Sequence, residues 1–270
     1  MTAKADPKSA HGDVVTWRNG PVQWLMFNRP RARNAMTFAM YEQLVAICEQ
    51  VDLDPDVRAL VLRGAGGKAF VAGTDISQFR KFATEQDALA YEDRGNRVME
   101  TLERVRVPTI AAIAGSCTGG GAAIAASRDL RIASPSARFG FPIARTLGNC
   151  LSMPNYVRLV ALMGAARAKD LLMTARLMPA VEMLAVGLVS EVVPDEEALW
   201  QRAQQLAEQV AGHAPLALWA TKEALRRIRD HLTPQLGADR DLIVACYMSR
   251  DFKEGVESFL SKRPPKWQGN

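Results

Sequence analysis

Two glycine turns in this chain combine residue types that can bind an anion. In residues 109–133 (TIAAIAGSCTGGGAAIAASRDLRIA), a buried strand over Thr109–Ala114 is followed by three glycines at positions 119–121 and an Ala-rich helix over Ala122–Ser127. The start of a helix presents backbone N–H groups without partners, and glycines let a ligand oxygen approach closely. This stretch therefore predicts an anion site.

The second turn lies upstream, in residues 68–78 (KAFVAGTDISQ). An apolar strand end leads into Ala72 and Gly73, and a helix start is expected at Thr74 or Asp75. Two such turns can aim two backbone N–H groups at one oxygen, which is the arrangement of an oxyanion hole. The alternative for each is a strand-to-helix turn that packs against neighbouring backbone.

Strands alternate with helices around these turns, which indicates an α/β fold. The runs Val14–Trp17 and Val22–Phe27 are rich in β-forming residues and are separated by an Asn-Gly turn, which predicts a hairpin. The other elements expected in this half are a helix capped by Thr37, a strand over Ala59–Arg63 and a strand over Asp129–Ala133. A charged helix is expected over Glu85–Arg106, and its charges, Glu92 among them, favour a solvated helix over a catalytic role.

The second half of the chain is expected to be mainly helical. Helices over Ser152–Met163 and Ala165–Ala175 precede a short strand over Gly187–Val193. A final long helix is expected over Asp241–Leu260. Only the short strand interrupts this series of helices.

Two further helices are expected to have an apolar face that needs a partner. One face runs from Leu199 to Val210 and the other from Leu218 to Ile228. That partner is either the α/β core or a second subunit, and we favour an oligomer. We therefore expect an α/β core over residues 1–195 and a helical region for oligomerisation, which also covers the cleft, over residues 196–270.

Composition and charge exclude several classes of protein. The 270 residues are 48% hydrophobic and carry a formal net charge of +5 with scattered basic residues, so no nucleic-acid partner is expected. The uncharged stretch between Arg106 and Arg128 contains Pro108 and three consecutive glycines. These residues indicate a buried strand, turn and helix, so no membrane span is expected.

Cysteines, histidines and the first residues point to a reduced, metal-free, cytoplasmic protein. The cysteines show neither metal-ligand nor disulfide spacing, and they are Cys48, Cys117, Cys150 and Cys246. The histidines, His11, His213 and His231, lie outside the cleft motifs, so neither a histidine base nor a metal site is expected. Residues 1–12 show no targeting pattern and are expected to be a frayed leader.

Six motifs in order make the chain similar to a known family. They are NRPRARNAM, GGKAFVAGTDI, the strand leading into GSCTGGG, ARFGFP, GLVSEVVP and FKEGVESFLSKRPPKW. In kind and order they resemble the motifs of the crotonase superfamily, that is, the enoyl-CoA hydratase/isomerase family. The resemblance implies a spiral of ββα units followed by a C-terminal helical oligomerisation region, with homotrimers that often pair into homohexamers.

The resemblance also implies that the ligand is an acyl-CoA thioester, with coenzyme A as part of the substrate and no separate cofactor. By matching position, the thioester carbonyl accepts hydrogen bonds from the backbone N–H groups of Thr74 and Gly120. These donors would stabilise the enolate that forms when a proton or a group leaves the carbon beside the thioester. The family match places the following residues along the CoA cleft: Arg31, Ala32, Ala35, Ala72, Thr74, Asp75, Ile76, Gly120, Phe259 and Lys262.

The chain departs from the family where the general acid and base usually lie. Family hydratases have one glutamate shortly after the glycine trio and another after the proline of the FGxP-like bend. This chain has Ala123 and Ile143 there, or Ala144 if the alignment slips by one residue. None of these side chains can move a proton, although such a group contributes about 10² to 10⁴-fold to the rate.

Other polar residues are candidates to replace the two glutamates. They are Asp75, Arg145, Asn149, Ser152, Asn155 and Tyr156. Asp75 and Ser152 could equally be helix caps, Asn149 a turn residue and Arg145 a surface ion pair. The sequence leaves these alternatives open.

Three functions are compatible with these observations. The first is an enzyme of the hydratase or isomerase type whose proton-transfer group has moved to another loop. The second is decarboxylation of a malonyl-type CoA without a base, in which Arg145 would bind the carboxylate. The third is a catalytically inactive homologue that binds acyl-CoA. We favour the first.

Overall fold

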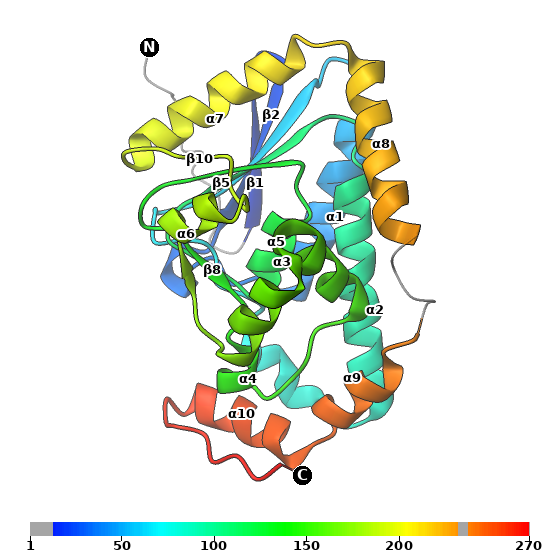
Figure 1. Cartoon of the computed structure of the whole chain (residues 1–270), viewed down its shortest axis with the longest axis vertical. Helices are drawn as coiled ribbons and strands as arrows, with labels where there is room; N and C mark the ends of the chain where they lie inside the picture. Colours follow the sequence, from blue (N-terminus) through cyan, green and yellow to red (C-terminus); the bar gives the residue numbers. More distant parts are fainter. Residues whose placement is uncertain (1–12, 232–236, 270) are drawn as a thin grey trace.

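A six-stranded sheet forms the centre of the molecule (Figure 1). The computed structural model describes residues 13–231 and 237–269. β1 and β2 form the predicted hairpin, and the later strands run parallel to β2 in the order β1-β2-β3-β5-β7-β10. The bounds are β1 Asp13–Asn19, β2 Val22–Asn28, β3 Ala59–Gly64, β5 Thr109–Ile113, β7 Leu130–Ala133 and β10 Glu191–Val192.

A second, four-stranded sheet carries both glycine turns. Its order is β4-β6-β8-β9, and β4, β6 and β8 run parallel to one another. The bounds are β4 Ala69–Val71, β6 Ser116–Thr118, β8 Arg138–Gly140 and β9 Met178–Pro179. Since β4 and β6 are parallel neighbours, the turns that follow them leave the sheet at the same edge.

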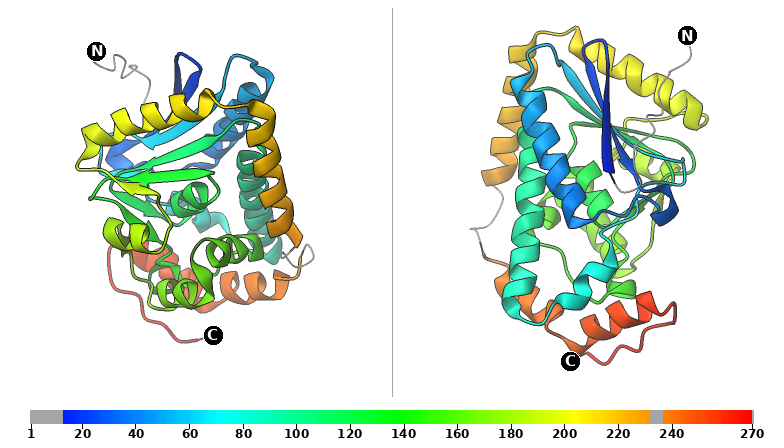
Figure 2. Two further views of the ribbon diagram at one scale, coloured as in Figure 1. Left: turned by 45° about the horizontal axis from the view of Figure 1, so that its top comes forward. Right: turned by 180° about the vertical axis from the view of Figure 1, so that it is seen from behind.

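Helices cover both faces of the large sheet, because its strands alternate their apolar side chains between two cores. Leu60 and Leu62 of β3 pack with α1, α2 and α3, whereas Val61 packs beneath α7 on the opposite face. Figure 2, seen from behind, shows α1 and α2 side by side. The bounds are α1 Phe38–Leu53, α2 Glu85–Arg104, α3 Gly120–Ala126 and α7 Glu196–Ala211.

The last two helices close the lower end of the molecule in the view of Figure 1. α9 (Arg240–Tyr247) packs against α2, and α10 (Arg250–Leu260) packs against the 3₁₀ helix η2 (Ile76–Lys81). The remaining helices are η1 Pro30–Ala32, α4 Ile143–Thr146, α5 Met153–Met173, α6 Ala180–Ala185 and α8 Pro215–His231. Within the described ranges, none of the helices has the length and apolarity needed to cross a membrane.

Three predicted elements differ from the structure. The helix expected over Asp241–Leu260 is two helices, because Ser249 has an extended backbone and caps α10 through its hydroxyl. The strand expected over Gly187–Val193 shrinks to the two residues of β10. The helix predicted over Glu85–Arg106 ends at Arg104 and is not merely solvated, because one of its faces is buried. The buried residues are Ala88, Glu92, Val98, Met99 and Leu102.

Other predictions about the chain's organisation are confirmed or stay open. The α/β class and the Thr37 cap, which accepts a hydrogen bond from Met40 N, are confirmed. The two helices predicted over residues 152–175 are confirmed within α5, which is interrupted by the non-helical backbone of Gly164. The leader expected over residues 1–12, with His11, lies outside the described residues. The division at residue 195 stays a prediction.

Candidate active site

Thr74 and Gly120 lie side by side at the edge of the four-stranded sheet. Val71 of β4 faces Cys117 of β6, and the third residues after these two are Thr74 and Gly120. A Cβ atom placed on Gly120 would lie 3.3 Å from Thr74 Oγ1, so the two turns are in contact. The structure thus brings together the two positions that the sequence pairs in an oxyanion hole.

The backbone N–H of Thr74 is directed away from the segment that pairs with it. In the parallel bridge between Met36 and Thr74, Met36 N donates to Gly73 O at 2.8 Å, and Asp75 N donates to Met36 O at 2.8 Å. Such a bridge uses the groups on either side of the paired residue, so the N–H of Thr74 itself points to the opposite side. This direction leaves it available to a ligand.

Gly120 is the first residue of α3, where a backbone N–H has no acceptor within the helix. Gly119 precedes it with φ 52° and ψ −120°, a backbone that favours glycine, and Gly119 N donates to Gly140 O at 3.0 Å. A Cβ on Gly120 would lie only 2.2 Å from Tyr41 Oη, so this position has no room for a side chain. Two separate turns therefore each offer one backbone donor.

A cavity of about 180 Å³ lies against these turns, and seven of the described aromatic residues line it. The aromatic residues are Phe38, Tyr41, Phe79, Tyr91, Phe141, Tyr247 and Phe259. The hydroxyl of Thr74 lies 3.0 Å from Tyr41 Oη and 3.0 Å from Tyr91 Oη, which ties its turn to α1 and α2. Burial raises the pKa of Tyr41 to about 12 and that of Tyr91 well above its ordinary value, so both hydroxyls stay protonated at neutral pH.

The structure places half of the predicted CoA-cleft residues on this cavity. Those that line it are Ala72, Thr74, Ile76, Gly120 and Phe259. Those outside the lining are Arg31, Ala32, Ala35, Asp75 and Lys262. Arg31, Ala32 and Lys262 are exposed, so their contact with CoA stays a prediction.

The positions of the family glutamates face the same cavity. Ala123 and Ile143 both line it, so apolar groups stand where two carboxyl groups would be expected. Of the candidate replacements, Asn149 and Asn155 also line the cavity. Arg145 is exposed and lies outside the lining.

Asp75, Ser152 and Tyr156 also lie outside the lining, and each is engaged in local hydrogen bonds. Asp75 caps η2, accepts hydrogen bonds from Ser77, and pairs with Arg29 at 3.1 Å. Burial alone would raise the pKa of Asp75, but hydrogen bonds from Ser77 and Arg29 outweigh it and leave the pKa below its ordinary value. Ser152 and Tyr156 are hydrogen-bonded to neighbouring groups. These contacts favour structural roles for all three residues.

The sequence favoured a solvated helix for the segment that contains Glu92, but Glu92 lies on the cavity wall. Ala88, Glu92 and Met99 are buried on one face of α2 at helical spacing, and a carboxyl group within such a stripe is the signal that could have revealed it. Burial raises the pKa of Glu92 to about 7, although the hydroxyls of Tyr247 and Ser152 lower it. This carboxyl group is thus poised to titrate near neutral pH.

Known proteins resemble the chain over nearly its whole length. A family model described as enoyl-CoA hydratase/isomerase matches residues 18–270. The short-chain-enoyl-CoA hydratase of Clostridium acetobutylicum is 34% identical over 252 residues, covering 93% of this chain and 95% of that protein. The 2,3-dehydroadipyl-CoA hydratase of Escherichia coli is 33% identical over 258 residues, covering 95% of this chain and 99% of that protein.

A solved structure gives the same result for the fold. Methylmalonyl-CoA decarboxylase in complex with 2-nitronate-propionyl-CoA matches with a TM-score of 0.87 and 29% identity, over 97% of this chain and 100% of that one. The predicted crotonase-like fold is therefore confirmed. The family match, the two relatives and the fold agree, and the chain belongs to the enoyl-CoA hydratase/isomerase family of the crotonase superfamily.

Proposed function

We propose that this protein is an enzyme that converts an acyl-CoA thioester through an enolate, which the backbone N–H groups of Thr74 and Gly120 stabilise. The observation that carries the proposal is the contact between their two turns on the wall of one cavity. When a bond to the carbon beside the thioester breaks, charge moves onto the carbonyl oxygen, and two fixed donors lower the energy of that state. Relatives named for acyl-CoA substrates support the ligand class.

The reaction is proposed to run without the usual pair of glutamates. Ala123 and Ile143 line the cavity and can neither donate nor accept a proton. A lyase or isomerase reaction would then need a proton-transfer group elsewhere on the wall. No separate cofactor is required, because coenzyme A enters as part of the substrate.

The CoA part of the substrate is proposed to extend from the cavity past η1 and the end of α10. Arg31 is an exposed cation of η1 and Lys262 an exposed cation just after α10, and cations suit the phosphate groups of CoA. Phe259 lines the cavity near Lys262 in the chain, so the C-terminal region can contact both parts of the ligand.

Decarboxylation of a carboxyacyl-CoA is a second candidate, and one cation favours it. Arg94 lines the cavity, with its guanidinium carbon 4.9 Å from the centre of the Phe38 ring. It could bind a substrate carboxylate, a role that the exposed Arg145 is not placed to fill. Loss of CO₂ makes the enolate directly, so this reaction needs the two backbone donors and no base. A proton from water at Cα then completes the acyl-CoA product. The similar solved structure is a methylmalonyl-CoA decarboxylase.

A panel of enoyl-, hydroxyacyl- and carboxyacyl-CoA substrates tests the proposed function by mass spectrometry of the products. We expect hydration, dehydration or isomerisation of a member of the first two groups. Release of CO₂ from a carboxyacyl-CoA alone would favour the second candidate, and binding without turnover would identify an inactive acyl-CoA-binding protein. Hydration of crotonyl-CoA at the rate of a two-glutamate hydratase would contradict the assignment of Ala123 and Ile143.

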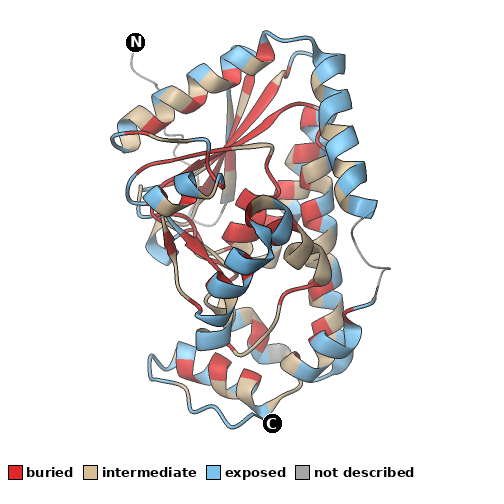
Figure 3. Cartoon of the chain, in the orientation of Figure 1, coloured by how far each residue is buried: buried red, intermediate tan, exposed pale blue. Residues whose placement is uncertain are grey.

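We also propose that the chain assembles into a homotrimer or homohexamer through α8. Among its residues, all of which the structure describes, none is buried (Figure 3), and four of its large apolar side chains are exposed. They are Leu216, Trp219, Leu225 and Ile228, with exposed fractions of 46–77%. Leaving four such side chains in water is costly, and a neighbouring subunit would cover them.

Light scattering tests this assembly. The native mass should be about three or six times the 29.6 kDa of one chain. Replacing both Leu225 and Ile228 by glutamate should shift the population towards the monomer. Val181→Glu is the control, because Val181 is 73% exposed on α6, which lies on the other side of the molecule from α8 in Figure 1. A monomeric wild-type protein would contradict the proposal.

A further inference from the structure

Glu92 is the only carboxylic acid that lines the cavity in the part of the chain that the structure describes. It is 8% exposed, and it faces the cavity together with Gly95, Val98 and Met99 of the same helix. The only cation on the wall, again among the described residues, is Arg94. A buried carboxyl group without an arginine or lysine partner costs free energy, so it needs either a compensating network or a function.

Tyr247 contacts the carboxyl group of Glu92 directly, and Asn149 contacts Tyr247. Tyr247 Oη donates a hydrogen bond to Glu92 Oε1 at 2.5 Å, and Asn149 Nδ2 donates to Tyr247 Oη at 3.0 Å. Both residues line the same cavity. Asn149 Oδ1 is buried and has no hydrogen-bond partner among the described groups. An unpaired acceptor thus lies beside this network, where a ligand could satisfy it.

The helix that carries Glu92 is fixed directly against the predicted oxyanion hole. Tyr91, the preceding residue of α2, is hydrogen-bonded to Thr74 Oγ1 at 3.0 Å. Both Tyr91 and Glu92 line the cavity, as do Thr74 and Gly120. A thioester carbonyl bound to the two backbone donors would therefore place its neighbouring carbon atoms in the space that Glu92 borders.

We propose that Glu92 is the catalytic base that removes the proton from Cα of the acyl group, an inference that rests on the proposed function. Its carboxylate takes the Cα proton, so the C–H bond breaks and an O–H bond forms. The C–H electron pair becomes the C=C bond of the enolate, and the carbonyl π pair moves onto the thioester oxygen between the two backbone donors. Returning the proton to Cα restores the substrate, and delivering it to Cγ of an unsaturated chain completes an isomerisation.

The charges around Glu92 suit a group that both accepts and returns a proton. Burial, Asp239 and Asp93 raise its pKa, while hydrogen bonds from Tyr247 and Ser152 lower it, and the result is about 7. A base with this pKa is substantially ionised at neutral pH and is also readily protonated. Other titratable groups that interact with its charge are Tyr41, Tyr91, Cys150 and Tyr156.

Exchange of the Cα hydrogens of butanoyl-CoA in D₂O tests the inference, because it requires only enolate formation. Mass spectrometry should detect exchange by the wild-type enzyme. Glu92→Gln should slow it by at least about 10²-fold, whereas Glu92→Asp should retain part of the rate. Glu100→Gln is the matched control, because Glu100 is exposed on the same helix. This variant should catalyse hydrogen exchange at the wild-type rate. If Glu92→Gln catalyses exchange at the wild-type rate, the inference is overturned.

The pH profile of exchange separates a catalytic role from a packing role. The carboxylate must be ionised to act as a base, so the wild-type rate should rise with pH and level off above about 7. Tyr247→Phe removes a hydrogen bond that lowers this pKa, so the midpoint should move to higher pH. A profile that does not respond to Tyr247→Phe would count against Glu92 as the titrating group.

Binding of butanoyl-CoA, measured by calorimetry, distinguishes failure of this inference from failure of the proposed function. Glu92→Gln should bind with wild-type affinity and yet lose exchange. If it loses binding and exchange together, Glu92 only shapes the cavity, and the inference is overturned while the proposed function stands. A wild-type protein that does not bind butanoyl-CoA would overturn both.

Discussion

A Gly120→Val variant is expected to lose at least about 10²-fold in kcat/KM on any acyl-CoA substrate and most of its affinity for the thioester. A Cβ atom at this position would lie 2.2 Å from Tyr41 Oη, and the two methyl groups of valine would extend beyond it. The carbonyl oxygen could then no longer reach the Gly120 N–H. Loss of one such donor raises a barrier by about 2.7 to 4 kcal/mol. Steady-state kinetics and calorimetry measure the two effects.

A double variant, Gly120→Ala/Tyr41→Phe, distinguishes two causes of lost activity. One is obstruction of the thioester, and the other is displacement of Tyr41. In Gly120→Ala/Tyr41→Phe, the atoms nearest the new Cβ are Thr74 Oγ1 at 3.3 Å and the ring carbon Cζ of residue 41 at 3.6 Å, so the methyl group can be accommodated. We expect this double variant to stay impaired while Tyr41→Phe alone remains active. If the double variant has full activity, the loss in Gly120→Val comes from displacement of Tyr41. If Gly120→Val keeps wild-type activity, the assignment of Gly120 to the oxyanion hole is wrong.

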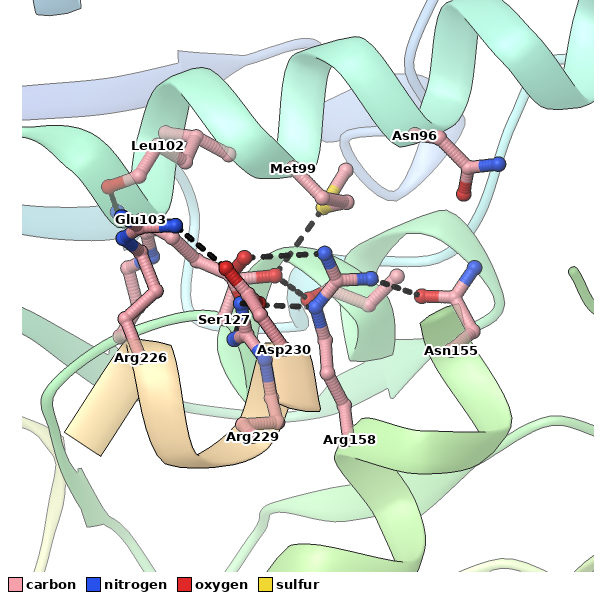
Figure 4. A network of polar contacts seen from close by, with 12 residues as sticks. Asn96, Met99, Leu102, Glu103, Ser127, Asn155, Arg158, Arg226, Arg229 and Asp230 are labelled. Carbon is pink, nitrogen blue, oxygen red and sulfur yellow. Dashed lines mark hydrogen bonds and ion pairs between the residues drawn. The ribbon is translucent and has the colours of Figure 1, made fainter. Parts of the chain in front are cut away.

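An Arg158→Met variant is expected to lower the free energy of unfolding by about 3 kcal/mol. Arg158 of α5 and Glu103 of α2 form a buried ion pair, with 4% and 7% of their side chains exposed and Nε 2.7 Å from Oε1 (Figure 4). Burial would raise the pKa of Glu103, but Arg158 and Arg229 outweigh it and hold the pKa below its ordinary value. Without Arg158, an ionised carboxylate stays buried with Arg229 as its remaining charged partner.

Denaturant unfolding measures this loss, and a surface pair provides the control. Arg227 is 73% exposed and pairs with Glu223 at 2.6 Å, so Arg227→Met should cost no more than about 0.5 kcal/mol. Glu103→Met/Arg158→Met should recover part of the stability, because no buried carboxylate remains. A cost for Arg158→Met as small as that of Arg227→Met would contradict a stabilising role for the buried pair.

The two glycine turns could be predicted because each is a local pattern. A strand, glycines and a helix follow one another in a short stretch, and their order alone indicates where backbone N–H groups lack partners. Ala123 and Ile143 were located by the resemblance to the family, whose glutamates follow the glycine trio and the proline of the bend. The structure then added what a pattern does not contain, namely that the turns of Thr74 and Gly120 touch.

Glu92 could not be assigned from the sequence, because its surroundings come from distant segments. Tyr247 belongs to α9, and Asn149 belongs to the loop between α4 and α5. A helix rich in charges resembles a solvated one until other helices cover one of its faces. The break at Ser249 was missed for a related reason, since a serine within an apolar helical pattern does not by itself indicate a cap.

The late position of α9 and α10 in the chain has a consequence for biosynthesis. A ribosome adds Thr74, Glu92 and Gly120 long before Tyr247 and the residues of α10. Until those helices emerge, the nascent polypeptide lacks part of the wall that shields Glu92 from water. The cavity is therefore completed only after every strand of both sheets has been synthesised.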